Sequence, residues 1–189
     1  MSVTHTSTLT PAALITEFAW PNPSVSNLDL SCFDGLKVLD LACGSGRNGL
    51  WFLARGAEVT FIDRDLSAMS HIDQANAYKL QRDLEAEAGP LLPVEEYDIV
   101  LVFNYLHRPL LPQIAKAVKS TGLIVYETFT TQQAQIGRPR NPDFLLTENE
   151  LKSVFANWQS LHYFEGRLCD PQSTQSSYKA QLIARKPTT

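Results

Sequence analysis

Short apolar segments recur along the chain, with room for a helix or a turn between them. These segments have the length and composition of strands at residues 37–42, 58–63, 77–83, 97–104, 122–129, 158–166 and 177–185. The fourth, YDIVLVFN, is almost wholly apolar, which is typical of a strand inside a parallel sheet. We therefore expect a buried parallel sheet.

Between the strands, apolar residues follow the spacing of a helix that packs on a sheet. Helices are predicted at residues 12–20, 47–55, 66–75 and 110–118. A further helix opens at Thr147, where Glu150 completes a capping box three residues on. Strands that alternate with helices predict a doubly wound α/β sheet. The polar connection 130–144 is long, and long ordered loops tend to be functional.

Composition narrows the class of protein. The chain has 189 residues, 44% of them hydrophobic and 19% charged, which fits one globular domain. The net charge is −4 and the basic residues are scattered, so they form no stripe for duplex nucleic acid. We expect a small-molecule partner, no nucleic acid and a monomer or homodimer.

The cysteines and the first residues indicate a compartment. Cys32, Cys43 and Cys169 form no CxxC pair, so neither a disulfide framework nor a metal site is expected. The first twenty residues lack the features of a signal peptide, and the apolar run 99–103 is too short to cross a bilayer. These features favour a cytoplasmic protein without a membrane segment.

A glycine-rich turn follows the first strand. Gly44, Gly46 and Gly49 match the G-x-G-x-x-G of dinucleotide-binding domains. Asp40 precedes the turn and would repel a diphosphate, which needs free backbone N–H groups. A carboxylate at that point instead suits S-adenosylmethionine, whose sulfonium and ammonium are positive. Glycines let the backbone approach such a ligand closely. A tight turn without any ligand is the alternative.

Two further carboxylates stand where the next strands end. Asp63 lies 19 residues after Gly44, at the position that hydrogen-bonds a ribose in such folds. Both kinds of cofactor carry a ribose, so Asp63 does not separate them. Asp83 is a candidate for the adenine amino group, with Leu84 beside the ring. For both aspartates the alternative is a surface residue at a strand end.

Several blocks together resemble a known family. Residues 38–48 (VLDLACGSGRN) resemble motif I of class I S-adenosylmethionine-dependent methyltransferases. Residues 104–110, 126–129 and 137–146 are similar to a bacterial group of small methyltransferases of the tellurite-resistance type. The matching blocks span about residues 21–185.

The resemblance implies a three-layer Rossmann-like α/β fold. Its sheet would have seven strands in the order 3-2-1-4-5-7-6, with the last strand antiparallel. Residues 36–189 would form the methyltransferase domain and residues 1–35 an N-terminal helix and lid segment. The register of the third strand is left open, because the segment before it is short.

The cofactor implied by the resemblance is S-adenosylmethionine. Asn104 would lie against its methionine part. Ala42 stands where the usual D-x-G-x-G-x-G has its first glycine. The expected cofactor-binding residues are Asp40, Ala42, Cys43, Gly44, Gly46, Arg47, Asp63, Arg64, Asp83, Leu84 and Asn104.

Catalytic candidates follow the fourth strand, on the side where open α/β sheets bind ligands. His107 is the candidate general base, with Tyr105 and Arg108 beside it. The alternative for His107 is a hydrogen bond to the loop backbone.

Substrate-binding candidates lie in the fifth strand and the following loop. Tyr126 and Glu127 interrupt an apolar strand, and Glu127 either faces the site or forms a structural ion pair. Arg138 and Arg140 either grip an anionic substrate or are solvated.

Methyl transfer to a small-molecule acceptor is the predicted function, with anionic compounds and soft chalcogen nucleophiles as the candidate acceptors. The alternatives are an NAD(P)-dependent oxidoreductase and a non-catalytic protein that binds S-adenosylmethionine. Nucleic-acid methylation is disfavoured, because residues 104–107 read NYLH rather than N/D-P-P-Y/F.

Overall fold

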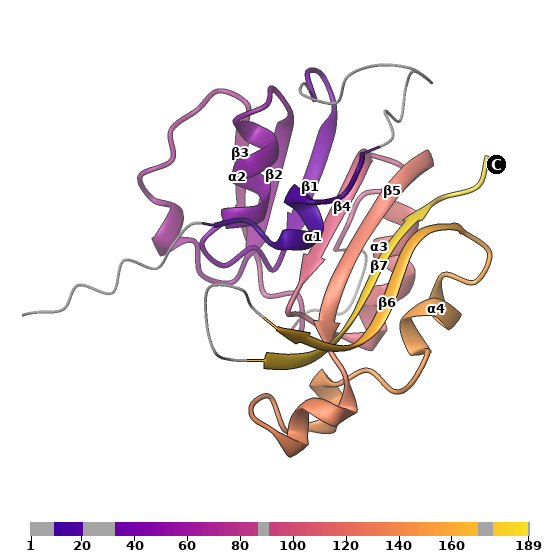
Figure 1. The fold of residues 1–189 in the computed structure, drawn as a ribbon. Helices are drawn as coiled ribbons and strands as arrows, with labels where there is room; N and C mark the ends of the chain where they lie inside the picture. The colour runs from indigo at the N-terminus through magenta and orange to yellow at the C-terminus, as the bar shows by residue number, and fades with distance from the viewer. Residues whose placement is uncertain (1–9, 21–32, 87–90, 170–175, 189) are drawn as a thin grey trace, which may run out of the picture.

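A computed structural model describes residues 10–20, 33–86, 91–169 and 176–188. Its described strands form one sheet in the order β3-β2-β1-β4-β5-β7-β6 (Figure 1). Strands β1 to β5 pair in parallel, whereas β7 runs antiparallel to β5 and β6. The predicted fold class is therefore confirmed. The strands are β1 (Lys37–Leu41), β2 (Glu58–Asp63), β3 (Ala77–Gln81), β4 (Tyr97–Phe103), β5 (Val118–Phe129), β6 (Gln159–Cys169) and β7 (Ser176–Arg185).

Short helices and 3-10 turns connect the strands. The α-helices are α1 (Ala13–Thr16), α2 (Arg47–Leu53), α3 (Leu111–Ala117) and α4 (Glu150–Val154). The 3-10 turns are η1 (Ser67–Met69), η2 (Arg108–Leu110), η3 (Thr131–Gln135) and η4 (Pro142–Phe144). The helix predicted at 12–20 is thus a single turn. The predicted segment 1–35 lies partly outside the described residues.

The prediction of a helix at residues 66–75 is wrong, because only the 3-10 turn η1 forms there. Leu66, Met69 and Ile72 are spaced by three residues, which is the period of a 3-10 helix rather than of an α-helix. Their backbone bonds agree, since Met69 N donates to Leu66 O and Ile72 N donates to Met69 O. Strand β3 then pairs with β2, with Asp63 opposite Gln81, and this pairing settles its register.

The helix after Thr147 begins later than predicted. It starts at Glu150, with Asn149 at the N-cap position in the left-handed conformation (φ +58°). Both the backbone N–H and the hydroxyl of Thr147 donate to the Glu150 carboxylate. The capping box therefore forms in part, because the threonine hydroxyl donates to the carboxylate instead of capping the helix.

Each face of the sheet has its own hydrophobic core. On one face, residues of α1 and α2 such as Ile15 and Phe52 pack on Val38, Val59 and Leu101. On the other, α3, η2 and α4 cover Leu39, Val100, Ile124 and their neighbours. The sheet is thus the middle of three layers.

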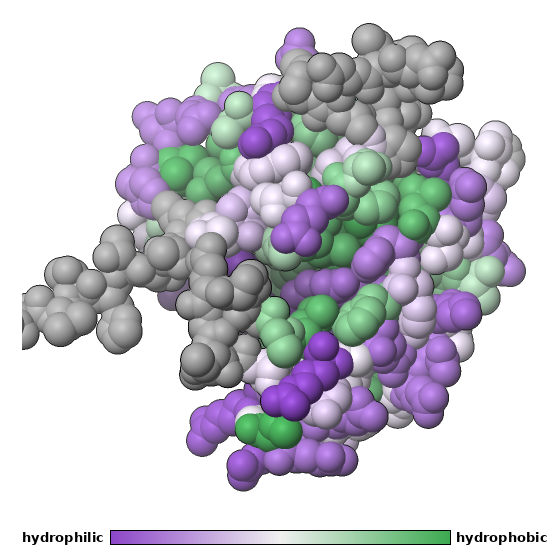
Figure 2. All heavy atoms as spheres, in the orientation of Figure 1, coloured by the Kyte–Doolittle hydropathy of each residue, from purple (hydrophilic) through white to green (hydrophobic). Residues whose placement is uncertain are grey.

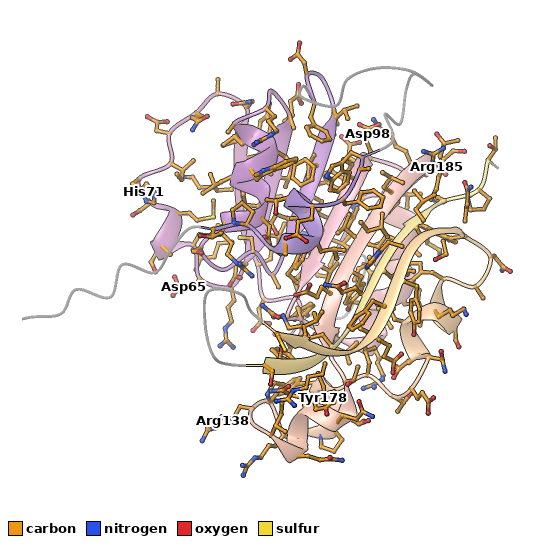
Figure 3. All side chains as sticks on the ribbon, viewed as in Figure 1. Asp65, His71, Asp98, Arg138, Tyr178 and Arg185 are labelled. Atoms are coloured by element: carbon orange, nitrogen blue, oxygen red, sulfur yellow. The ribbon has the colours of Figure 1, made fainter. Side chains whose placement is uncertain are left out.

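The two ends of the sheet differ in what they carry. Figure 3 shows Asp98 and Arg185 at the end where β4 begins, and Arg138 and Tyr178 at the opposite end. The carboxyl ends of β1, β2, β4 and β5 share this second end. On the face drawn in Figure 2, separate hydrophobic areas are set among hydrophilic residues. No helix among the described residues is long and apolar enough to cross a membrane.

Candidate active site

The turn between β1 and α2 is held in left-handed backbone conformations. Ala42, Gly44 and Gly46 have φ values of +51°, +55° and +71°. This conformation explains the glycine that related motifs carry at the position of Ala42, since an L-residue there costs about 1–2 kcal/mol. A Cβ on Gly46 would lie 2.5 Å from the Met69 methyl carbon, whereas one on Gly44 would meet nothing within 4 Å. Gly44 therefore borders open space.

Asp40 supports this turn from the interior. Its side chain is 2% exposed, and its Oδ2 accepts a hydrogen bond of 2.8 Å from Gly49 N. A Cβ on Gly49 would lie 2.9 Å from that oxygen, so the third glycine makes room for the carboxylate. Burial raises the pKa of Asp40 to about 7, while the Gly49 hydrogen bond opposes the rise. One oxygen of the carboxylate is thus used to hold the backbone of the helix that follows the turn.

A pocket of about 400 Å³ opens at the carboxyl ends of β1 to β4. Its volume is within the range of small-molecule sites, roughly 300–1,000 Å³. Five of the eleven expected cofactor-binding residues come together here, and Arg82, Glu85 and Phe144, which were not expected, join them. The other six expected residues do not belong to this lining: Asp40, Cys43, Gly44, Gly46, Arg47 and Asn104. The lining residues are Ala42, Asp63, Arg64, Arg82, Asp83, Leu84, Glu85, Tyr105 and Phe144.

Asp63 joins the pocket to the glycine turn. Its Oδ2 accepts a hydrogen bond of 2.8 Å from Gly44 N, and its Oδ1 accepts one of 3.1 Å from Asp65 N. Asp83 is held similarly, by Glu85 N at 3.0 Å. Arg64 and Arg82 also line the pocket, so its lining residues include charges of both signs rather than negative charge alone.

Tyr105 lines the pocket with an unpaired hydroxyl. Among the described residues its Oη is buried and has no hydrogen-bond partner. Burial is the main reason that its pKa is raised, and the carboxylates of Glu85, Asp83 and Asp63 raise it further. Tyr105 is therefore a neutral hydroxyl donor, and buried hydroxyls without partners usually await a ligand or water. Carboxylates, this hydroxyl and the open space over Gly44 fit a nucleoside-bearing ligand.

Three further residues lie in or directly after the same turn: Cys43, Arg47 and Asn48. The Cys43 thiol is 3.7 Å from the Met69 sulfur, and burial raises its pKa, so it stays protonated. Arg47 donates to Thr10 O at 2.8 Å, and Asn48 accepts from Ala12 N at 3.0 Å. The turn therefore also anchors the segment that leads into α1.

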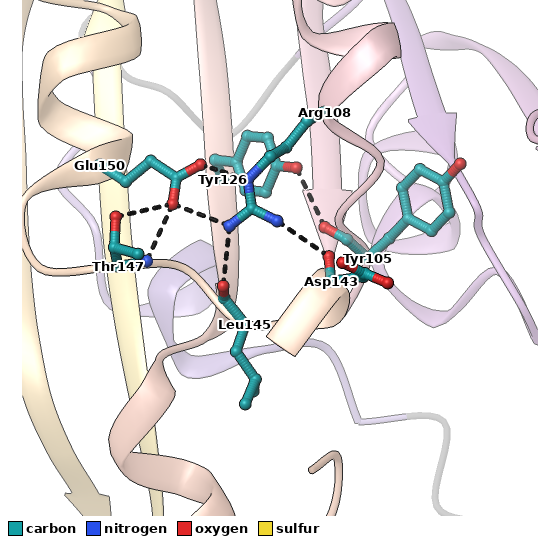
Figure 4. Close-up of polar contacts among 7 residues, drawn as sticks. All are labelled: Tyr105, Arg108, Tyr126, Asp143, Leu145, Thr147 and Glu150. Atoms are coloured by element: carbon teal, nitrogen blue, oxygen red, sulfur yellow. Dashed lines mark hydrogen bonds and ion pairs between the residues drawn. The ribbon is translucent and has the colours of Figure 1, made fainter. Parts of the chain in front are cut away.

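Arg108, a predicted catalytic residue, is bound within the protein (Figure 4). Its Nε and Nη2 donate to both oxygens of Glu150, at 2.7 and 2.9 Å. Its Nη1 donates to Asp143 O and its Nη2 to Leu145 O. Four of the five guanidinium donors are thus used to hold the loop after β5. The Glu150 carboxylate, in turn, is the main cause that raises the pKa of Arg108.

Tyr126 and Glu127 are also committed to internal contacts. Tyr126 is fully buried, and its hydroxyl donates to Tyr105 O at 3.0 Å. Glu127 accepts from Lys179 Nζ and from Gln181 Nε2, each at 2.7 Å. Lys179 also donates to Asn104 Oδ1 at 2.7 Å. Lys179 was not predicted as a site residue. The one signal in the sequence was a charged residue within the otherwise mostly apolar strand β7.

The remaining candidates have fewer contacts. His107 is half-buried at the start of η2, and among the described residues its ring forms no hydrogen bond. Arg138 and Arg140 are exposed, and in the described part of the chain their guanidinium groups make no ion pair. Figure 3 shows Arg138 projecting from the loop at the carboxyl end of the sheet.

Comparisons with known proteins identify the family. The model of the tellurite resistance protein TehB family matches residues 27–176. A curated relative from Haemophilus influenzae, named a probable S-adenosyl-L-methionine-dependent methyltransferase TehB, is 29% identical over 167 residues. The match covers 79% of this chain and 57% of that protein. A ubiquinone biosynthesis O-methyltransferase from Rhodopseudomonas palustris is 32% identical over 108 residues, covering 52% of this chain and 42% of its own.

Solved structures agree with the fold. The crystal structure of TehB from Haemophilus influenzae matches with a TM-score of 0.61 and 25% identity, over 82% of this chain and 58% of that one. A structure from Listeria monocytogenes, titled a putative S-adenosylmethionine-dependent methyltransferase, matches with a TM-score of 0.65 and 17% identity, over 83% and 93%. This chain thus spans a little over half of the TehB proteins it matches. The predicted resemblance is confirmed, and the chain belongs to the tellurite resistance protein TehB family.

Proposed function

We propose that this chain is an S-adenosylmethionine-dependent methyltransferase that acts on a small-molecule acceptor. The observation that carries the proposal is the pocket beside the glycine turn, where Asp63 both lines the cavity and hydrogen-bonds Gly44 N. Membership of the TehB family supports the choice of cofactor. When bound, this cofactor supplies an electrophilic methyl group on a sulfonium.

The residues of the pocket suggest how the cofactor is held. Asp63 would accept hydrogen bonds from the ribose hydroxyls, and Asp83 from the adenine amino group, with Leu84 against the ring. The Tyr105 hydroxyl would donate to the nucleoside part. The methionine part would extend across the turn at Gly44 towards Asn104 at the end of β4.

The hydrogen bonds of the turn disfavour a dinucleotide. A diphosphate needs free backbone N–H groups. Here Gly44 N donates to Asp63, Gly46 N to Cys43 O, and Gly49 N to Asp40. Two of these three bonds go to carboxylates, which would repel a diphosphate as well as compete for its donors.

The N-terminal segment is proposed to cover the site. Thr10 and Ala12 are hydrogen-bonded to Arg47 and Asn48, directly after the glycine turn. Residues 1–35 would then act as a lid over the domain formed by residues 36–189.

The acceptor is proposed to be anionic or a soft chalcogen nucleophile. Arg138 and Arg140 are exposed and unpaired among the described residues, so they are available to an anion. His107, half-buried with no hydrogen bond to its ring in the described chain, is the candidate base for an acceptor that must lose a proton. A sulfur, selenium or tellurium nucleophile would need little base help.

Methyl transfer from labelled S-adenosylmethionine to a panel of acceptors tests the function. The panel contains tellurite, selenite, thiols and small carboxylates. We expect transfer to at least one anion or chalcogen compound, and a loss of transfer to anions in Arg138→Ala and Arg140→Ala. If both variants transfer like the wild type, the arginines have no part in binding the acceptor. If the cofactor binds and no acceptor is methylated, the result favours the alternative of a non-catalytic protein that binds S-adenosylmethionine.

A further inference from the structure

Lys179, whose side chain is largely buried, places its ammonium group at the end of β4. It lies on β7, opposite Phe129 of β5, and its side chain is 12% exposed. Its Nζ donates to Glu127 Oε1 and to Asn104 Oδ1, each at 2.7 Å, and lies 4.9 Å from the centre of the Phe129 ring. The lysine therefore reaches across β5 to contact the residue that follows β4.

This contact sets which way the Asn104 amide faces. Asn104 has a left-handed backbone (φ +54°), and its N–H donates to Glu127 O at 2.8 Å. Because the amide oxygen accepts from Lys179, the amide nitrogen is the part left to face a ligand. An amide nitrogen donates hydrogen bonds, so it suits an anionic partner such as a carboxylate.

Glu127 offsets the cost of partly desolvating the ammonium group. The two charges neutralise each other at 2.7 Å, and the second oxygen of Glu127 accepts from Gln181. Among the described residues, Lys179 uses two of its three N–H donors in this way.

The position of the pocket indicates which end of the cofactor reaches Asn104. In the proposed site Asp63 after β2 and Asp83 after β3 would bind the nucleoside, on one side of β1. Strand β4 lies on the other side of β1. The far end of the cofactor, which carries an α-carboxylate, would then extend across β1 towards Asn104 and Lys179.

We propose that Lys179 is a positioning residue, which orients Asn104 so that its amide nitrogen binds the α-carboxylate of S-adenosylmethionine. The inference rests on the proposed function and adds a specific contact to it. It predicts that Lys179 matters only for ligands that carry the amino-acid part. S-adenosylhomocysteine carries this part, whereas 5′-methylthioadenosine has the same nucleoside and lacks it.

Calorimetric titration of these two ligands tests the inference. In Lys179→Met we expect S-adenosylhomocysteine to bind roughly 10–30-fold more weakly and 5′-methylthioadenosine to bind within about twofold of the wild type. Asn104→Ala should likewise weaken the binding of S-adenosylhomocysteine and leave the binding of 5′-methylthioadenosine nearly unchanged. The double variant should lose little more than Asn104→Ala alone, because the lysine acts through the amide. Lys179→Arg should restore most of the affinity.

The control is Lys186→Met. Lys186 has a similarly buried side chain (17% exposed) and donates to Val118 O at the opposite end of the sheet. It should leave the ratio of the two affinities unchanged. If Lys179→Met does not fold, the pair Lys179→Met with Glu127→Gln removes both buried charges together and serves in its place.

Equal weakening of both ligands in the Lys179 variant would overturn the inference, because a merely structural lysine gives that result. No weakening of either would overturn it too. A wild-type protein that binds S-adenosylhomocysteine in these experiments leaves the proposed function standing. A wild-type protein that does not bind it contradicts the proposed function, and the inference falls with it.

Discussion

The charged residues after β2 and β3 line an open pocket, whereas those after β4 and in β5 are bound to one another. The side chains of Asp63 and Asp83 accept hydrogen bonds from backbone N–H groups and still border the cavity. Arg108 and Glu127 instead have charged partners from distant segments, Glu150 and Lys179. The difference shows that a charged residue at the carboxyl end of the sheet does not always contact a ligand. It can instead hold together the loops and strands that form the site.

The largest expected effect is a loss of stability in the variant Arg108→Met. The variant loses both bonds to Glu150 and two bonds to backbone carbonyls, so we expect it to lower the free energy of unfolding by about 3 kcal/mol. Affinity for S-adenosylhomocysteine should stay within about threefold. Urea denaturation and calorimetry measure the two quantities.

The matched control is Arg138→Met, an exposed arginine of the same loop, which should change stability by less than about 0.5 kcal/mol. If the Arg108→Met variant is as stable as the wild type but has lost methyl transfer, Arg108 acts at the acceptor. Its role would then not be to hold the structure together.

Asp40→Asn tests the buried carboxylate under the turn. The folded-state pKa of about 7 lies above the unfolded value near 3.9, so the stability linked to this group is complete below about pH 4 and falls as the pH rises towards 7. The amide keeps an acceptor for Gly49 N and removes the charge. We expect the variant to be more stable than the wild type by about 2–3 kcal/mol at pH 8, with a smaller difference at pH 5.

Denaturation at both pH values measures this difference. Asp98→Asn is the control, because the Asp98 carboxylate is paired with Lys119 at 2.9 Å and should gain no stability on losing its charge. A gain for Asp40→Asn that is the same at pH 5 and pH 8 would show that its ionisation is not involved.

Asp63→Ala tests the open half of the site directly. The loss of a carboxylate that accepts from ribose hydroxyls should weaken S-adenosylhomocysteine binding roughly 30-fold, about 2 kcal/mol. The control is Asp65→Ala, whose exposed carboxylate accepts from Ser67 N and should change affinity by less than about threefold. Equal affinities for the two variants in calorimetry would remove Asp63 from the cofactor site.

Ala42→Gly is expected to have the smallest effect. Glycine tolerates the φ of +51°, so the variant should be more stable by about 0.5–1 kcal/mol. The urea midpoint should rise with an unchanged slope. Ala54→Gly is the control, since Ala54 has an ordinary φ of −63° and should lose stability instead. A lower midpoint for Ala42→Gly would mean that the alanine methyl group packs better than its backbone suggests.

Local patterns in the sequence were sufficient for the strands and for the glycine turn. The predicted strand 58–63 coincides with β2, and the carboxylates expected at the ends of β2 and β3 do line one pocket. Each of these features has a local sequence signal, a short apolar run or a residue at the end of such a run, whereas the pocket itself forms because parallel strands end at the same edge of the sheet. The order of the strands followed from the family resemblance rather than from spacing.

Long-range pairing could not be predicted in this way. Glu127 and Lys179 are 52 positions apart, and Arg108 and Glu150 are 42 apart. Which charges meet depends on the antiparallel return of β7 and on the path of the loop after β5. A single sequence contains no signal that links these positions. The structural roles of these four residues are therefore visible only in the folded structure.

Calorimetric titration of the wild-type protein with S-adenosylhomocysteine and with NAD tests the central claim most directly. The account predicts binding of S-adenosylhomocysteine at one site per chain and no measurable heat with NAD. Binding of NAD without any binding of S-adenosylhomocysteine would contradict it, because the turn after β1 would then hold a diphosphate in spite of Asp40 and Asp63.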